Sequence, residues 1–147
     1  MRFIRRQIAC YFVAVLGGGL LLEAGCNKEQ GEKLLNVSGK MTTVDGRPVT
    51  TGNVTFYPDT SKANSTGHQP MGVLDAEGNY ELSVPGSKKG APAGWYKVVV
   101  YAVDDPQPGK PNKYLVNKDY ADVTTTPLKI EVIESPKPGR YDFKLRR

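Results

Sequence analysis

Short runs of alternating apolar and polar residues, each ended by residues that turn the chain, constrain this sequence most. The runs 80–84 and 128–132 show the period of two that places apolar side chains on one face of a β-strand. From residue 34 onward no stretch of ten residues or more has the apolar spacing of three to four that an amphipathic helix needs. The sequence therefore predicts an all-β fold with almost no helix.

About seven strands are expected, and 16 glycines and 11 prolines are available to end them and to form the turns between them. Residues 95–103 (WYKVVVYAV) form the longest apolar run, which predicts a central strand covered on both faces. We expect residues 71–75 and 79–85 to form a hairpin. The runs that we expect to be strands are 36–42, 52–57, 71–75, 79–85, 95–103, 128–133 and 141–146.

The first 25 residues have the layout of an export signal. Residues 1–7 carry three arginines, residues 8–22 carry no charge, and small residues precede Cys26. The uncharged run contains three glycines and is shorter than the roughly 20 apolar residues that a membrane-spanning helix needs. We therefore expect residues 1–25 to be a signal peptide that is removed on export, which leaves one domain of ordinary size.

The end of this segment resembles the bacterial lipobox, in which small residues precede a cysteine that is acylated and becomes the new N-terminus. Ala24, Gly25 and Cys26 match that pattern, whereas Glu23 stands where the lipobox normally has an apolar residue. Cys10 lies inside the signal, so Cys26 is the single cysteine of the expected mature chain. The resemblance implies a lipid anchor at Cys26, with residues 26–35 as a polar tether.

Five motifs together resemble the carboxypeptidase regulatory-like, or transthyretin-like, domain of small bacterial envelope lipoproteins. The resemblance covers residues 37–145 and implies an immunoglobulin-like or transthyretin-like sandwich over residues 36–147. It also implies an accessory role, as a structural layer or in binding partners or glycans. The catalytic histidines of related hydroxyisourate hydrolases are missing from this sequence. The motifs are residues 37–40 (VSGK), 44–49 (VDGRPV), 52–58 (GNVTFYP), 75–82 (DAEGNYEL) and 92–98 (PAGWYKV).

The sequence offers few parts for catalysis or metal binding. His68 is the only histidine, so a zinc site or a Ser-His-Asp triad lacks its components, and we expect this side chain to be exposed in the polar loop 60–70. The pairs Asp75 with Glu77 and Asp104 with Asp105 lack EF-hand spacing, and turn chemistry accounts for Asp75. We predict no catalytic residue, no metal and no cofactor, and therefore no enzyme.

The charge distribution argues against nucleic-acid binding. The formal net charge of +5 falls to +3 once Arg2, Arg5, Arg6 and Glu23 are removed with the signal, because 17 basic and 14 acidic residues remain. The basic residues are scattered, so they form no continuous stripe that follows a phosphate backbone. The adjacent basic pairs after the signal are Lys88-Lys89 and Arg146-Arg147.

The aromatic residues are the remaining candidates for binding. We expect Trp95 to lie in the core, and we expect Tyr114 and Tyr120, in an irregular segment, to be exposed ligand contacts. The sequence thus predicts a membrane-anchored, non-enzymatic module of the cell envelope, on the periplasmic or outer-surface side. Its role would be structural or in protein interaction. The alternative is a carbohydrate-binding module that uses Tyr114 with Tyr120.

Overall fold

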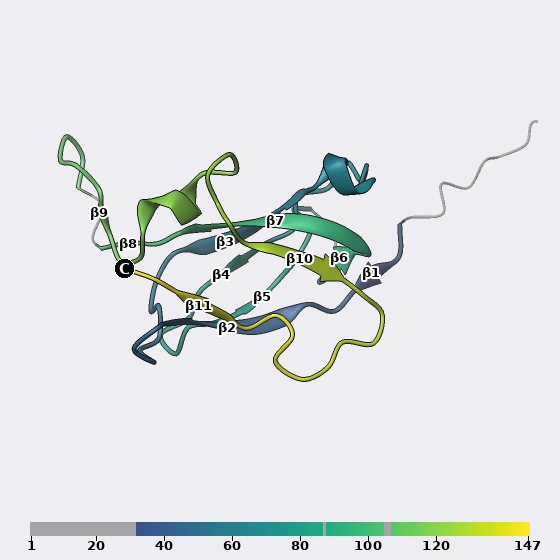
Figure 1. Ribbon diagram of the computed structural model, residues 1–147, viewed down its shortest axis with the longest axis horizontal. Helices are drawn as coiled ribbons and strands as arrows, with labels where there is room; N and C mark the ends of the chain where they lie inside the picture. Colours follow the sequence, from purple (N-terminus) through teal and green to yellow (C-terminus); the bar gives the residue numbers. More distant parts are fainter. Residues whose placement is uncertain (1–31, 87, 105–106) are drawn as a thin grey trace, which may run out of the picture. The chain divides into compact units, whose positions relative to one another are not determined.

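The computed structural model describes residues 32–86, 88–104 and 107–147 (Figure 1). The expected signal peptide, Cys26 and most of the expected tether lie outside the described residues. The described part of the chain is all-β, as predicted, with two short 3-10 helices besides the strands. These elements are β1 (Leu34–Leu35), β2 (Ser38–Thr43), β3 (Asn53–Pro58), η1 (Thr60–Lys62), β4 (Met71–Val73), β5 (Asn79–Glu81), β6 (Ala91–Pro92), β7 (Gly94–Tyr101), β8 (Val103–Asp104), β9 (Lys113–Tyr114), η2 (Lys118–Ala121), β10 (Lys129–Val132) and β11 (Phe143–Leu145).

Two sheets form the sandwich. A four-stranded antiparallel sheet has the order β10-β7-β3-β4, and a three-stranded sheet has the order β11-β2-β5, in which β11 and β2 run parallel. Figure 1 shows the first sheet above the second. Four and three strands make the seven that the alternating runs predict. Two ribbons, β1-β6 and β8-β9, complete the pairing among the described residues.

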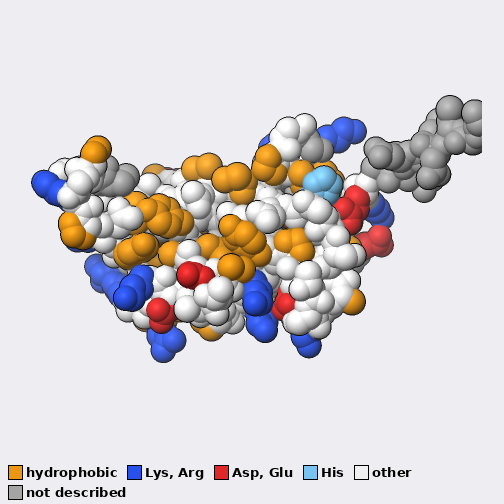
Figure 2. Space-filling model, turned by 90° about the horizontal axis from the view of Figure 1, so that it is seen from above, with side chains coloured by type: hydrophobic (Ala, Val, Ile, Leu, Met, Phe, Trp, Pro, Cys, Tyr) orange, Lys and Arg blue, Asp and Glu red, His pale blue; other side chains and the backbone are white. Residues whose placement is uncertain are grey.

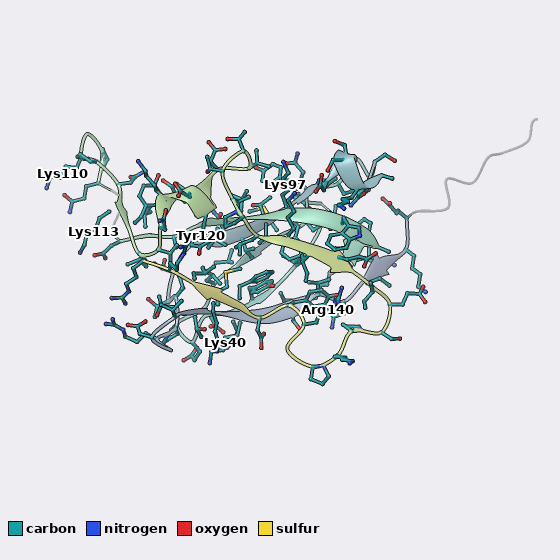
Figure 3. The ribbon with its side chains drawn as sticks, in the orientation of Figure 1. Lys40, Lys97, Lys110, Lys113, Tyr120 and Arg140 are labelled. Atoms are coloured by element: carbon teal, nitrogen blue, oxygen red, sulfur yellow. The ribbon has the colours of Figure 1, made fainter. Side chains whose placement is uncertain are left out.

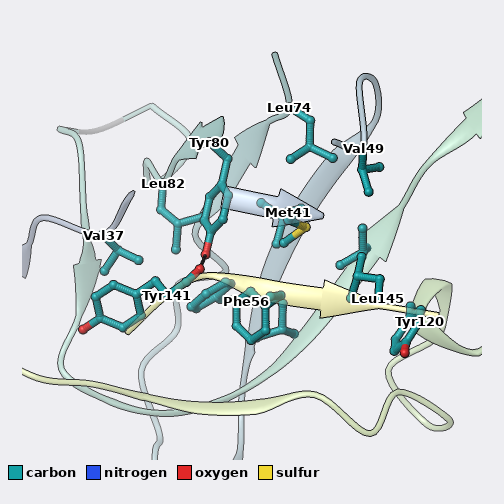
Figure 4. Packing of buried hydrophobic residues seen from close by; sticks show 14 of the residues in the cluster. Val37, Met41, Val49, Phe56, Leu74, Tyr80, Leu82, Tyr120, Tyr141 and Leu145 are labelled. Carbon is teal, nitrogen blue, oxygen red and sulfur yellow. Dashed lines mark hydrogen bonds between the residues drawn. The ribbon is translucent and has the colours of Figure 1, made fainter. Parts of the chain in front are cut away.

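The core lies between the two sheets and follows from the alternation along each strand. In β7, Tyr96, Val98 and Val100 are fully buried on the inner face, and in β3 Val54 and Phe56 are fully buried as well. The three-stranded sheet contributes residues such as Met41, Tyr80 and Leu145, several of which Figure 4 shows. Burial of such side chains supplies most of the driving force for folding.

Tyrosine hydroxyls in the core are hydrogen-bonded to the backbone. Tyr80 Oη donates to the carbonyl oxygen of Tyr141 at 2.7 Å, the contact drawn as a dashed line in Figure 4. Tyr96 Oη donates to the carbonyl oxygen of Pro92 at 2.9 Å. Burial raises the pKa of Tyr80 far above its ordinary value, so this hydroxyl remains a hydrogen-bond donor. Phe56 packs between these two tyrosines, with ring centroids 6.5 Å from Tyr80 and 5.8 Å from Tyr96.

Two expectations about the strands need correction. Leu34–Leu35, which we assigned to the tether, form β1 and pair with β6. Both side chains are half-buried, and Leu35 packs against the core. The expected hairpin 71–85 forms only in part, since β4 pairs with β3 and β5 pairs with β2. Its two arms meet at the bridge between Met71 and Ser83.

Gly72 explains how the arms approach one another. A Cβ atom at this position would lie 2.7 Å from the carbonyl oxygen of Glu81, so a larger residue would push the two arms apart.

The outer edge of β10 is blocked against pairing with another strand. The guanidinium of Arg140, which is labelled in Figure 3, donates two hydrogen bonds of 3.2 Å to the carbonyl oxygen of Glu131. Immediately after the strand, the backbone N–H of Ile133 donates to Tyr141 Oη at 3.2 Å. Occupied edge groups discourage addition of a foreign strand.

Candidate binding surface

The outer face of the four-stranded sheet carries side chains that alternate with those of the core. We define the outer face by eleven residues, which the pairing register arranges in rows across the strands. Its most exposed member is Val73, with 72% of its surface accessible. The outer face consists of Trp95, Lys97, Val99 and Tyr101 from β7, Asn53, Thr55 and Tyr57 from β3, Met71 and Val73 from β4, and Lys129 and Glu131 from β10.

Figure 2 looks down on this side of the molecule. Hydrophobic side chains run across the middle of the view, and most lysines and arginines lie around its margin. Exposed apolar surface with a polar rim is typical of an interaction site. The outer face is therefore the best candidate binding surface among the described residues.

One row of the outer face brings two lysines together beside an aromatic ring. Lys97 lies directly opposite Lys129 on one side and opposite Tyr57 on the other. Figure 3 shows Lys97 standing above the sheet. It is half-buried, and none of the ion pairs among the described residues includes it. Like charges on directly opposed residues repel one another.

Among the described residues, Asp59 is the carboxylate that forms an ion pair with this pair of lysines. Its side chain is only 3% exposed, and its Oδ2 atom lies 3.9 Å from Lys129 Nζ. The other oxygen, Oδ1, accepts hydrogen bonds from the hydroxyl and the backbone N–H of Ser61, at 2.6 and 3.2 Å. These bonds, together with the positive charges of Lys129 and Lys97, lower the pKa of Asp59. No described residue donates a hydrogen bond to Oδ2.

Trp95 lies on the outer face and not in the core, which corrects the expectation from sequence. It alternates with Tyr96, whose ring takes the inward position. The indole is half-buried, and Lys62 Nζ lies 5.8 Å from its ring centre. A cation at that distance is attracted by the negative face of the ring.

An open groove of about 480 Å³ borders Tyr57. We call it the Tyr57 groove. Thr55, Tyr57 and Met71 of the sheet line it, together with residues 67–69 and 84–85. Its volume falls within the range of small-molecule sites. Tyr57 therefore connects the lysine pair to a concave surface. The alternation with Phe56 already predicts that Tyr57 points outward, but nothing in the sequence indicates the groove beside it.

The structure separates the two tyrosines that we expected to act together. Tyr120, in η2, is only 4% exposed and packs in the core, where its Oη accepts a hydrogen bond of 3.2 Å from the backbone N–H of Arg146. Tyr114 is 36% exposed, and its ring makes an edge contact with Tyr101 at 6.0 Å. An exposed pair of Tyr114 and Tyr120 therefore does not exist, because η2 turns Tyr120 inward.

The remaining candidate groups have local structural roles. His68 is exposed as expected, with its Nε2 atom 4.0 Å from the carboxylate of Glu32. Asp75 Oδ1 accepts hydrogen bonds from the backbone N–H groups of Glu77 and Asn79, as its assignment to a turn predicts. Asp104 forms an ion pair with Lys113 at 2.8 Å, and Asp105 lies outside the described residues.

Within residues 32–86, 88–104 and 107–147, no three His, Cys, Asp or Glu side chains gather closely enough to hold a metal ion. In the same part of the chain, no helix has the length and apolar character needed to cross a membrane. Comparison of the chain with protein-family models, curated proteins and solved structures found no match.

Proposed function

We propose that this chain is a membrane-anchored, non-enzymatic module of the cell envelope that acts by binding a partner through its outer face. The observation that carries this proposal is the exposure of apolar and aromatic side chains on the outer face, where Val73 is 72% exposed. Trp95 and Tyr57 on the same face are half-buried and offer flat surfaces with a polar edge. Such residues are enriched where proteins bind one another.

The anchoring part of the proposal rests on the sequence. The expected lipobox residues 24–26 supply an acylated cysteine, and the resemblance to envelope lipoproteins of the carboxypeptidase regulatory-like family supports the same location. Two acyl chains hold a protein stably to a membrane, whereas one chain does so only marginally.

The non-enzymatic part rests on how the polar groups are used. General acid–base catalysis needs groups within hydrogen-bond reach of one substrate. The described carboxylates instead have local structural partners: Asp75 and Asp122 accept backbone hydrogen bonds in turns, and Asp104 pairs with Lys113. The single histidine lies in an exposed loop.

Carbohydrate binding is the second candidate, and the Tyr57 groove favours it. The groove combines an aromatic ring with polar side chains from Thr55, His68 and Gln69. This is a different place from the pair of Tyr114 and Tyr120 that the sequence analysis proposed.

The proposal is tested in intact envelopes with a photoreactive amino acid in place of Val73. We expect a discrete crosslinked product from this position and none from a matched probe at Lys144, which is exposed on the other sheet. Equal labelling from both positions would contradict a binding role for the outer face.

Mass spectrometry should find an acylated peptide that begins at Cys26, and Cys26→Ser should release the protein or leave it attached through an uncleaved signal.

A further inference from the structure

We propose that the Tyr57 groove and the adjacent Lys97 and Lys129 bind an acidic polysaccharide, a chain of pyranose rings that carry carboxylate or sulfate groups. This inference rests on the proposed function, because it requires the outer face to be a binding surface. It adds the chemical class of the ligand and the residues that recognise it.

The lining of the groove suits a sugar ring because both are apolar on one side and polar at the edge. The C–H groups of a pyranose face pack against an aromatic ring, and Tyr57 presents its ring beside the apolar side chains of Met71 and Pro85. Sugar hydroxyls need hydrogen-bond partners, and Thr55 and Gln69 supply them at the walls. No hydrogen bond between described residues occupies the side chains of Thr55 and Gln69.

The charges beside Tyr57 specify an acidic ligand. Lys97 and Lys129 lie opposite one another, and two carboxylates lie near them. Asp59 pairs with Lys129 at 3.9 Å and Glu131 pairs with Arg140 at 4.0 Å, so Lys97 forms no ion pair with a described residue. The Oδ2 atom of Asp59 faces Lys129 and is buried, so an approaching anion meets the ammonium groups and not the carboxylate. A carboxylate or sulfate group next to Lys97 would supply the missing negative charge and remove the repulsion between the lysines.

The shape of the site favours a chain-like ligand over a bilayer or a protein strand. The groove of about 480 Å³ is concave and reaches the lysine pair through Tyr57, so a polymer of small rings can occupy both at once. A flat membrane surface cannot enter a groove. At the edge of β10, the strand that carries Lys129, Arg140 and Tyr141 occupy backbone groups and so block the addition of a strand from another protein.

The experiment measures binding of the full chain, purified in detergent, to three soluble polymers. Polygalacturonate tests for carboxylates, dextran sulfate tests for sulfates, and unmodified dextran is the neutral control. We expect tight binding to at least one acidic polymer and at least about tenfold weaker binding to dextran. Tyr57→Ala and Lys97→Gln should each weaken binding to that polymer about tenfold or more. Raising the salt concentration to about 1 M should also weaken it, because charges are then screened beyond about 3 Å.

Two matched variants separate the site from general attraction between charges. Lys144→Gln removes a lysine from the other sheet, and Tyr114→Ala removes an exposed aromatic ring at a different place. Both should bind as the unmodified chain does, and all four variants should retain its circular dichroism spectrum and a cooperative melt. Equal loss of binding in Lys97→Gln and Lys144→Gln would overturn the proposal, as would full binding by Tyr57→Ala.

Absence of binding to both acidic polymers would also overturn it, as would binding only to vesicles of anionic lipid. The crosslinking experiment at Val73 is independent of these results. A position-specific crosslink without polysaccharide binding would leave the outer face as a binding surface and reject the acidic polysaccharide as its ligand.

Discussion

The two faces of the four-stranded sheet are built from neighbouring residues of the same strands, yet their surroundings are opposite. The inner face packs Phe56 and Val54 into the core with no accessible surface. The outer face carries Tyr57, Lys97 and Val73 next to them, with partial or full exposure. Along one strand, alternate side chains build the core while their neighbours stay accessible to a partner, so we expect substitutions on the two faces to have separate effects.

The largest expected difference lies between the adjacent residues Phe56 and Tyr57. Phe56→Ala removes a ring that is fully buried between Tyr80 and Tyr96, which should lower the free energy of unfolding by about 3–5 kcal/mol. Tyr57→Ala should cost about 1 kcal/mol or less, since its ring lies on the half-exposed outer face. Chemical denaturation measures both. Similar losses would show that the outer face is part of the stabilising core.

A smaller effect is expected from removing one buried hydroxyl. Tyr80→Phe leaves the carbonyl oxygen of Tyr141 without its hydrogen bond of 2.7 Å in a buried place, which should cost about 1–3 kcal/mol. The matched outer-face variant is Tyr101→Phe, whose hydroxyl accepts a hydrogen bond from the exposed Asn112. It should change stability by no more than about 0.5 kcal/mol. Equal effects would contradict the division between the faces.

Much of the inner face could be predicted from sequence, because the period of two is a local signal. The run 52–57 became β3 and most of the run 95–103 became β7, and the seven strands of the two sheets match the expected number. The outer face of β7 is partly exposed, however, and is not covered as we expected. The apolar residues 80–84 proved to be buried, as their alternation predicted.

The outer face was predicted poorly, because hydrophobicity alone does not decide which of two adjacent aromatic residues points inward. Trp95 lies outside since Tyr96 takes the inward position, and the neighbouring strands fix that choice. Tyr120 is buried because η2 turns it inward. The sequence does not indicate this, because the segment around Tyr120 has no periodic pattern. The Tyr57 groove joins residues of β3, β4 and the loop 67–69, which are separated along the chain and meet only in the folded protein.

Asp59 provides a test at the border between the faces, where β3 leaves the sheet. The pKa of Asp59 in the folded protein lies below the ordinary value of 3.8. The ionised carboxylate therefore stabilises the fold at pH values above 3.8. This stabilisation is lost as the pH falls through the lower pKa of the folded protein. Asp59→Asn should therefore melt at a lower temperature than the unmodified chain at neutral pH, by less than Tyr80→Phe does. The difference should shrink below pH 3.8. A difference that is independent of pH would mean that the amide and the carboxylate differ only in packing.

The smallest effect is expected at Val73, which tests whether the exposed apolar surface contributes to stability at all. Val73→Thr adds a hydroxyl to a side chain that is 72% exposed, where water can solvate it, so the free energy of unfolding should change by no more than about 0.5 kcal/mol. The same substitution at Val54, which is fully buried in the adjacent strand, places a hydroxyl in the core and should cost about 1–3 kcal/mol. Denaturation of both variants measures the contrast between the two faces with identical chemistry. A comparable loss at Val73 would show that the outer face is held in place by apolar contacts and is not a free binding surface.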